Sequence, residues 1–258
     1  MLNSRIIPVL LVRNKGLVKT VRFKEYKYVG DPINAVRIFN EQQADELVVL
    51  DIDATAEGRS PDYKMIENLS LECRMPLCYG GGIKNIDQAL KILSLGVEKI
   101  SLNSSAMENP QIISELSKQV GSQSVVVSMD VKKKLFSSRY ECYTHNANKR
   151  TRIDPIKFAR LVENYGAGEL IINSIDNDGI MKGYDLDLIH NVNSKVNIPV
   201  TALGGAGSLE DISTLIENEQ IIGAAAGSLF VFKGKYRAVL INYPTMREKE
   251  KLYKGLSH

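Results

Sequence analysis

Short apolar runs recur along the chain, separated mostly by amphipathic segments of helix length. The runs occupy residues 5–12, 45–52, 75–81, 97–103, 124–131, 168–175, 198–205 and 221–230. Because they are apolar without strict alternation, they fit strands of a parallel sheet that is covered on both faces. Eight such strands alternating with helices predict an α/β fold in which the sheet closes into a (β/α)8 TIM barrel.

The second half of the chain repeats the first at a spacing of about 123 residues. The stretch ADELVVLDID, which starts at Ala44, falls on AGELIINSID, which starts at Ala167. Self-similarity of this kind indicates a duplicated structural unit. We therefore predict one domain, residues 1–258, built from half-barrels at about 1–120 and 121–245 and ending in a charged C-terminal tail.

Composition and charge narrow the class of protein. The chain has 258 residues, 44% of them hydrophobic, which is enough for one large core. Its formal net charge is +3, with Lys and Arg spread along the chain, so a nucleic-acid partner is not implied, although small anions fit this charge.

Three cysteines are too few for a disulfide framework or a zinc site. The apolar run 6–12 is too short to span a membrane. We expect a cytoplasmic protein without metal, cofactor, nucleic-acid or membrane partner.

Glycines end two strands at matching positions of the repeat. Gly81 and Gly82 follow one strand, and Gly204 and Gly205 follow its partner. Glycine lets backbone N–H groups approach an anion closely. The next strand of each half ends in small polar residues and glycine, which add hydroxyls and helix-start amides: Asn103, Ser104, Gly227 and Ser228. One cluster alone is explained equally well by a tight strand-to-helix turn, but two matching clusters favour two phosphate sites.

Carboxylates gather at the same strand ends, where catalysis occurs in barrels of this kind. Asp51 and Asp178 are expected to line a substrate pocket, and Asp130 lies among apolar strand residues. Since burial raises the pKa of a carboxyl group, Asp130 is the best candidate for a general acid or base. A structural aspartate that caps a loop is the alternative. Lys19, expected in a flexible loop, is either a cation above the barrel mouth or a solvated surface lysine.

A second group of charges is expected at the opposite end of the strands. Each member stands at the start of an apolar run, and both signs are present: Arg5, Glu46, Lys99 and Glu169. They should form a ring at the barrel bottom. On the residues alone a stabilising salt-bridge ring is favoured, because this face of such barrels usually serves stability.

Several motifs together make the chain resemble the cyclase subunit of imidazole glycerol phosphate synthase over roughly residues 1–232. They are RIIPVLLV, ADELVVLDI, GGGI, YTH, GAGE, DNDG, KGYDL and GGAG. That family closes an imidazole ring on a substrate with a phosphate at each end, using ammonia from a glutaminase docked beneath the barrel. The resemblance implies that the glycine–serine sites bind these phosphates, that Lys19 sits on a covering loop, and that Asp130 is one of two catalytic aspartates. It also implies that the bottom ring gates ammonia entry.

The chain departs from the family pattern at the end of the barrel where catalysis is expected. Leu11, opposite Asp130 in the repeat, replaces the second catalytic aspartate. Thr20, Leu203 and Val231 stand where the family usually has glycine, serine and histidine. Leucine cannot move a proton, so ring closure by the usual acid–base pair is not expected.

The chain keeps the residues of the ammonia gate but lacks one catalytic aspartate. In this combination it resembles paralogues that serve sugar amidotransferases in cell-surface polysaccharide (lipopolysaccharide) pathways, where an acetamido sugar becomes an acetamidino sugar. The ending KYRAVLINYPTMREKEKLY also suits that subgroup. Two alternatives remain: a histidine-pathway cyclase, and a sugar-phosphate isomerase of the same lineage. The isomerase is disfavoured because it needs no ammonia and should need both aspartates. The expected partners are a glutaminase at the barrel bottom, a sugar amidotransferase and a phosphorylated small molecule.

Overall fold

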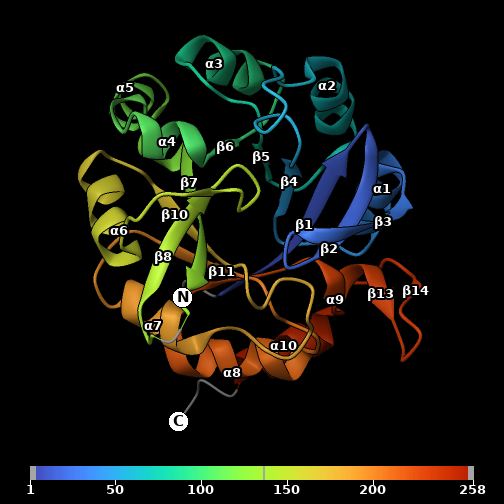
Figure 1. Cartoon of the computed structure of the whole chain (residues 1–258). Helices are drawn as coiled ribbons and strands as arrows, with labels where there is room; N and C mark the ends of the chain where they lie inside the picture. Colours follow the sequence, from blue (N-terminus) through green and yellow to red (C-terminus); the bar gives the residue numbers. More distant parts are fainter. Residues whose placement is uncertain (1–3, 136, 255–258) are drawn as a thin grey trace.

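The computed structural model describes residues 4–135 and 137–254, and its centre is a closed barrel of parallel strands (Figure 1). The barrel strands are β1 (Arg5–Arg13), β4 (Leu47–Asp51), β5 (Leu77–Gly80), β6 (Lys99–Leu102), β7 (Val125–Lys133), β10 (Glu169–Ser174), β11 (Val200–Leu203) and β12 (Gly223–Ala226). Each pairs in parallel with the next, and β12 pairs with β1, which closes the barrel. Each strand overlaps one of the eight apolar runs, and β1 and β7 extend one or two residues beyond theirs. The predicted (β/α)8 fold is confirmed.

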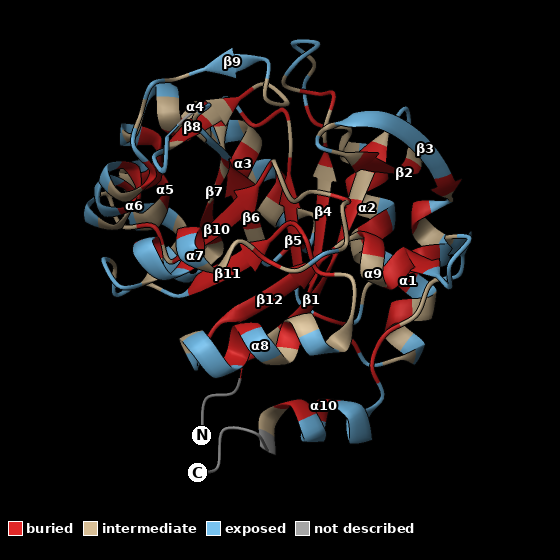
Figure 2. Ribbon diagram, turned by 60° about the horizontal axis from the view of Figure 1, so that its bottom comes forward, coloured by how far each residue is buried: buried red, intermediate tan, exposed pale blue. Residues whose placement is uncertain are grey.

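Helices cover the outside of the barrel and turn their exposed residues to solvent (Figure 2). They are α1 (Pro32–Glu41), α2 (Tyr63–Glu72), α3 (Ile86–Ser94), α4 (Ser104–Glu108), α5 (Gln111–Val120), α6 (Pro155–Asn164), α7 (Leu186–Asn193), α8 (Leu209–Glu219), α9 (Ser228–Val231) and α10 (Met246–Lys254). Helices α1 and α6 begin with a capping aspartate followed by proline, which is a strong helix-start signal. Among the described residues, no helix is long and apolar enough to cross a membrane.

Strand alternation divides the apolar residues between two cores. The larger core lies between strands and helices, whereas a smaller cluster fills the barrel interior with Ile7, Val9, Val48, Cys78, Val126, Ile171, Leu203 and Ala225. Successive side chains of a strand point to opposite faces. On β1, Ile6 therefore joins the outer core while Ile7 and Val9 enter the barrel. The same alternation puts Arg5 at the bottom of the interior and Leu11 at its top.

Both halves carry an antiparallel hairpin after a long first strand. Strands β2 (Gly16–Val21) and β3 (Lys24–Gly30) follow β1, and β8 (Tyr140–Thr144) and β9 (Lys149–Arg150) follow β7. The expectation of a flexible loop at Lys19 is wrong, because this residue lies on β2. Asn14 and Lys15 adopt the left-handed conformation of a two-residue hairpin turn, and Leu17 and Val18 are buried.

The end of the chain is more structured than a charged tail. A short hairpin, β13 (Phe232–Lys233) with β14 (Ala238–Val239), leads to α10, which packs against α8. Figure 2 places α10 at the end of the molecule opposite β3 and β9. Although most of α10 is exposed and charged, Lys249 and Leu252 are buried.

Candidate functional site

A cavity of about 530 Å³ opens at the carboxyl ends of the barrel strands. The structure brings together there every residue predicted for the mouth. The lining includes Lys19, Asp51, Gly81, Gly82, Asn103, Ser104, Asp130, Asp178, Gly204, Gly205, Gly227 and Ser228. Leu11, Thr20 and Leu203 also line the cavity, whereas Val231 is buried in the outer core. A cavity of this size can enclose a small organic molecule with most of its surface buried.

The glycine turns have a steric reason of their own. Gly81 has φ +116°, and a Cβ on it would lie 2.3 Å from the carbonyl oxygen of Asp51. Gly205 has φ +115°, and a Cβ would lie 2.1 Å from the carbonyl oxygen of Gly183. Only glycine fits such positions without strain. The tight turns that the sequence analysis gave as an alternative are therefore present. Because glycine has no side chain, the backbone at these turns also faces the cavity directly.

Each glycine turn lies beside the start of a short helix, since β5 pairs with β6 and β11 pairs with β12. Helix α4 starts at Ser104 and α9 starts at Ser228, and neither has a side-chain cap at its first amides. The two halves of the barrel thus present the same arrangement of glycine backbone, serine hydroxyl and helix-start N–H groups. This arrangement is suited to two anions.

Asp130 is held at the centre of the mouth by two amides. Its Oδ1 accepts a hydrogen bond from Asn173 Nδ2 at 3.0 Å, and its Oδ2 accepts one from Asn103 Nδ2 at 3.0 Å. Burial raises the pKa of Asp130 to about 7 although both amides oppose the rise, and the charge of Asp178 adds to it. A carboxyl group with such a pKa can both give and take a proton near neutral pH.

Sequence reasoning did not identify either hydrogen-bond partner of Asp130. Asn173 was missed, although it is a polar residue within an apolar run and lies opposite Asp130 in the register of β7 and β10. Asn103 was predicted to bind phosphate, but its side chain is engaged by the aspartate. One of the two N–H groups of the Asn103 amide is thus engaged.

Lys19 reaches into the mouth from β2 and is buried. Its Nζ donates to the carbonyl oxygen of Val9 at 2.6 Å, and a Cβ on Gly227 would lie 2.6 Å from this amine. Burial lowers the pKa of Lys19 to about 8, an effect that the charge of Asp178 partly offsets. The amine therefore stands beside the second glycine–serine turn as a fixed cation.

Asp178 ties the first hairpin to the loop after β10. Thr20 Oγ1 donates to Asp178 Oδ2 at 2.8 Å, and the backbone N–H of Phe23 donates to the same oxygen at 3.3 Å. The backbone N–H of Arg22 also donates to the carbonyl oxygen of Asp178 at 2.9 Å. Burial raises the pKa of Asp178, while the bonds from Thr20 and Phe23 and the charge of Lys19 oppose the rise. The hydroxyl of Thr20, which a glycine would lack, thus fixes the wall of the cavity.

Asp51 lines the cavity and also caps the loop that follows β4. Its Oδ1 accepts from the backbone N–H groups of Asp53 at 3.2 Å and Ala54 at 3.1 Å. Arg59 lies 3.5 Å from its other oxygen. Burial raises the pKa of Asp51, and Arg59 and the two amides act against this.

The floor of the cavity is mostly apolar. Leu11 and Leu50, which are register partners on β1 and β4, line it together with Val9, Ile171 and Leu203. The same residues belong to or pack on the cluster that fills the barrel interior. Below Asp130 on β7 lies Ser128, and below Asn103 on β6 lies Ser101, so the barrel interior carries two hydroxyl groups among its apolar side chains.

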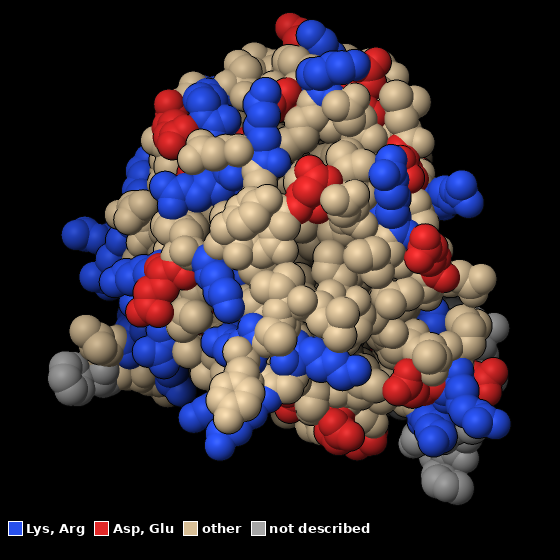
Figure 3. All heavy atoms as spheres, turned by 90° about the vertical axis from the view of Figure 1, so that its right-hand side faces the viewer, with Lys and Arg blue, Asp and Glu red and all other residues tan. Residues whose placement is uncertain are grey.

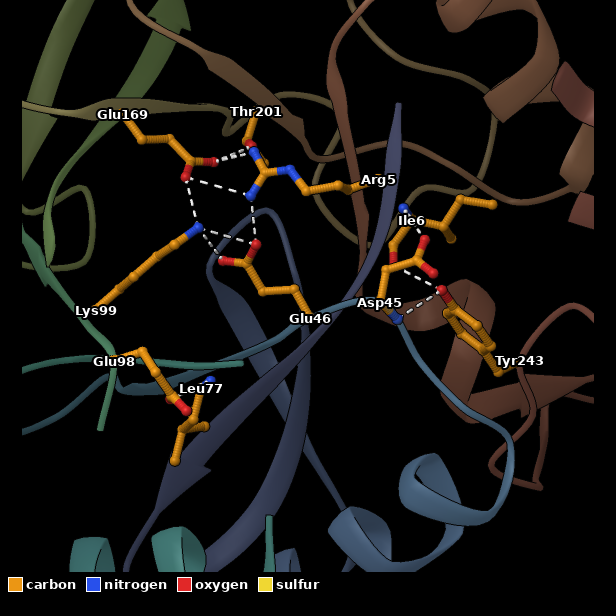
Figure 4. A network of polar contacts seen from close by, with 10 residues as sticks. All are labelled: Arg5, Ile6, Asp45, Glu46, Leu77, Glu98, Lys99, Glu169, Thr201 and Tyr243. Carbon is orange, nitrogen blue, oxygen red and sulfur yellow. Dashed lines mark hydrogen bonds and ion pairs between the residues drawn. The ribbon is translucent and has the colours of Figure 1, made fainter. Parts of the chain in front are cut away.

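At the bottom of this interior the four predicted charges meet in one ring (Figure 4). Arg5 pairs with Glu46, and its Nη2 lies 2.7 Å from Glu169 Oε1. Lys99 Nζ lies 2.9 Å from Glu46 Oε1 and 2.9 Å from Glu169 Oε2. Each carboxylate thus contacts both cations. Burial alone would lower the pKa of Lys99 and raise that of Glu169, but the ion pairs reverse both shifts.

One further residue joins the ring that sequence reasoning missed. The buried hydroxyl of Thr201 donates to Glu169 Oε1 at 2.6 Å, so Glu169 has a fixed partner outside the four charges. A threonine in an apolar run is the only signal that could have indicated it.

Over residues 5–237 the chain matches the family described as "Histidine biosynthesis protein". The chain belongs to this family. A relative from Vibrio vulnificus, named "Putative imidazole glycerol phosphate synthase subunit hisF3", is 61% identical over 97% of this chain and 96% of its own length. A Pseudomonas aeruginosa protein named "Putative imidazole glycerol phosphate synthase subunit hisF2" is 49% identical over 96% and 98%. The "Imidazole glycerol phosphate synthase subunit HisF" of Alkaliphilus metalliredigens is 42% identical over 89% and 91%.

Proposed function

We propose that this member of the histidine biosynthesis protein family is an ammonia conduit. It receives ammonia from a partner glutaminase at the barrel bottom and releases it at the mouth for amidotransfer onto an acetamido sugar in cell-surface polysaccharide biosynthesis. One observation carries the proposal: Arg5, Glu46, Lys99 and Glu169 form one ring of ion pairs, whereas the mouth has Leu11 where the family resemblance implies a catalytic aspartate. Conduction needs the entrance but not that aspartate.

The ring of four charges is explained better by a role in admitting ammonia than by a contribution to the stability of the fold. Ion pairs held away from water contribute little net stability, because the cost of removing the charges from water offsets their attraction. Apolar side chains of similar volume would close the barrel bottom equally well. Charges at this place therefore favour a role in admitting a small polar molecule.

The interior above the ring suits neutral ammonia. It is lined by Val9, Val48, Val126 and Ile171, with Cys78 close to the ring. Burying an unpaired ammonium ion there would be very costly, whereas a small neutral molecule pays only for lost hydrogen bonds. We infer that ammonia crosses this interior as the neutral molecule, and that the side chains that fill it move apart to let it pass.

The mouth suits a phosphorylated ligand. The two glycine–serine turns offer backbone N–H groups to anions, and Lys19 adds a positive charge beside Gly227. We assign the ligand as a small molecule that carries at least one phosphate and lies over the apolar floor formed by Leu11, Leu50 and Leu203.

A second candidate function has a specific observation in its favour. Asp130, with a pKa raised to about 7, has the proton affinity that a general acid or base needs, as in a histidine-pathway cyclase. Such an enzyme would have to close the imidazole ring with this single group, since Leu11 cannot take part.

Purification and product analysis distinguish the two functions. The conduit should co-purify with a glutaminase and a sugar amidotransferase, and its loss should remove the acetamidino group from cell-surface sugars. Lys99→Ala and Glu46→Ala should uncouple glutamine hydrolysis from formation of that product, whereas Lys118→Ala, on the exposed face of α5, should not. A histidine requirement with unchanged surface sugars after gene deletion would instead restore the cyclase.

A further inference from the structure

The C-terminal segment Tyr243–Lys254 is attached to the barrel bottom by buried polar contacts, of which Figure 4 shows those of Tyr243. Tyr243 is 7% exposed and Lys249 is 6% exposed. Lys249 Nζ lies 2.7 Å from Asp45 Oδ1, and Tyr243 lies with its ring against Phe39 and Phe230. A lysine is rarely buried unless it is paired. These contacts are therefore more than the packing of a surface helix.

Tyr243 contacts the backbone beside the gate directly, and Lys249 holds the Asp45 side chain that contacts it. The hydroxyl of Tyr243 donates to the carbonyl oxygen of Ile6 at 2.8 Å and accepts from the N–H of Asp45 at 3.1 Å. Asp45 Oδ2 in turn accepts from the N–H of Ile6 at 2.9 Å. Ile6 follows Arg5 directly, and Asp45 precedes Glu46 directly.

At this level β1 is still paired with β12 on one side, but on the side of β4 side chains take the place of the sheet. The paired residues of β1 and β4 begin at Val9 and Val48, above the gate. Below that point, the two backbone groups of Ile6 are satisfied by Asp45 and Tyr243. The relative position of Arg5 and Glu46 therefore depends on residues that come from the other end of the chain.

We propose that Tyr243 and Lys249 are positioning residues that hold the ammonia gate closed. Displacing α10 releases Asp45 and Ile6, and this separates Arg5 from Glu46. The exposed face of α10 carries Arg247, Glu248, Glu250 and Lys251 beside the barrel bottom, so a glutaminase that docks there can reach the gate through this helix. This inference rests on the proposed conduit function, which it extends to the way the entrance is controlled.

Cys78 provides a probe of the gate that needs no partner protein. It is 1% exposed, lies in the interior cluster and is the register partner of Lys99. Burial and the nearby carboxylates raise the pKa of its thiol, so its reaction with a small thiol reagent should be slow in the closed barrel. Cys142 is 0% exposed but belongs to the outer core, so it reports general loosening of the fold.

The experiment compares Lys249→Met and Tyr243→Phe with Lys251→Met, a matched change on the exposed face of the same helix. Labelling of Cys78 and Cys142 is followed at the level of peptides by mass spectrometry. Lys249→Met and Tyr243→Phe should each accelerate labelling of Cys78 about tenfold, as expected when the buried hydrogen bonds of a local structure are lost. Labelling of Cys142 and both rates in Lys251→Met should stay unchanged.

An unchanged rate at Cys78, or parallel acceleration at Cys142, would overturn the positioning role. With glutaminase and acceptor enzyme present, the two variants should also consume more glutamine per product formed while their rate on free ammonium stays the same. Because the labelling uses the barrel alone, its failure would leave the conduit proposal intact. Failure of nitrogen transfer in the unaltered protein would remove the conduit and leave the labelling result standing.

Discussion

Removing one charge from the bottom ring should cost more than removing a surface charge, because the ring leaves an unpaired partner behind. In Lys99→Met, Arg5 alone faces the carboxylates of Glu46 and Glu169. The Lys99 side chain is 18% exposed, and those of Glu46 and Glu169 are 4% and 8% exposed. The site therefore lies between an exposed ion pair, worth about 0–1 kcal/mol, and a buried one, whose disruption costs about 3–5 kcal/mol.

We expect Lys99→Met to lower the free energy of unfolding by about 2–3 kcal/mol. Adding Glu46→Gln to this variant restores a neutral ring of Arg5 and Glu169, and it should recover at least about 1 kcal/mol through the coupling of neighbouring charges. The control Lys118→Met, on the exposed face of α5, should change stability by less than about 0.5 kcal/mol.

Urea unfolding of the unaltered protein, Lys99→Met, Glu46→Gln, the double variant and the control at one pH and ionic strength measures these differences. A Lys99→Met protein as stable as the control would refute the reasoning that the ring is withheld from water. Strict additivity of the two substitutions would refute the claim that its charges depend on one another.

Three further predictions concern the mouth. Because the pKa of Asp130 in the folded protein is raised to about 7 from 3.8, the folded state binds this proton more tightly. Its contribution to stability should be full at pH below about 4 and fall as the pH rises toward 7, and Asp130→Asn should abolish this fall in urea titrations. Millimolar phosphate should raise the thermal midpoint, less so in Lys19→Met, and no rise at all would count against the anion sites. Given the imidazole-pathway substrate and free ammonium, the protein should turn over ~10² to 10⁴ more slowly than an aspartate-bearing cyclase, because Leu11 cannot transfer a proton, and comparable turnover would sink this expectation.

The parts of the molecule set by local patterns could be predicted from the sequence. Apolar runs gave the eight barrel strands, and the charge at the start of four runs gave the bottom ring, because alternation along a strand carries Arg5, like Ile7, to the barrel interior. The glycines at strand ends could also be interpreted locally, because a residue with a left-handed φ is usually glycine.

Contacts between residues far apart in the sequence could not be predicted in this way. The Thr20 hydroxyl reaches Asp178 only because β2 and β3 form an ordered hairpin, and a run with few apolar residues gave no strong signal for it. The amide of Asn173 and the hydroxyl of Thr201 are isolated polar groups in apolar runs, so sequence indicates that they have partners without saying which. The attachment of α10 to Asp45 is equally hidden in a segment that reads as a charged tail.

The central claim, that ammonia travels inside this barrel, is tested most directly by isotope competition. Glutamine labelled with ¹⁵N at its amide is supplied to the barrel, its glutaminase and the sugar amidotransferase in the presence of excess unlabelled ammonium. If ammonia passes through the interior, the new amidino nitrogen should carry mostly ¹⁵N, and Lys99→Ala should shift it toward the unlabelled pool. A product whose label matches that of the mixed ammonium pool in the unaltered protein would contradict the account.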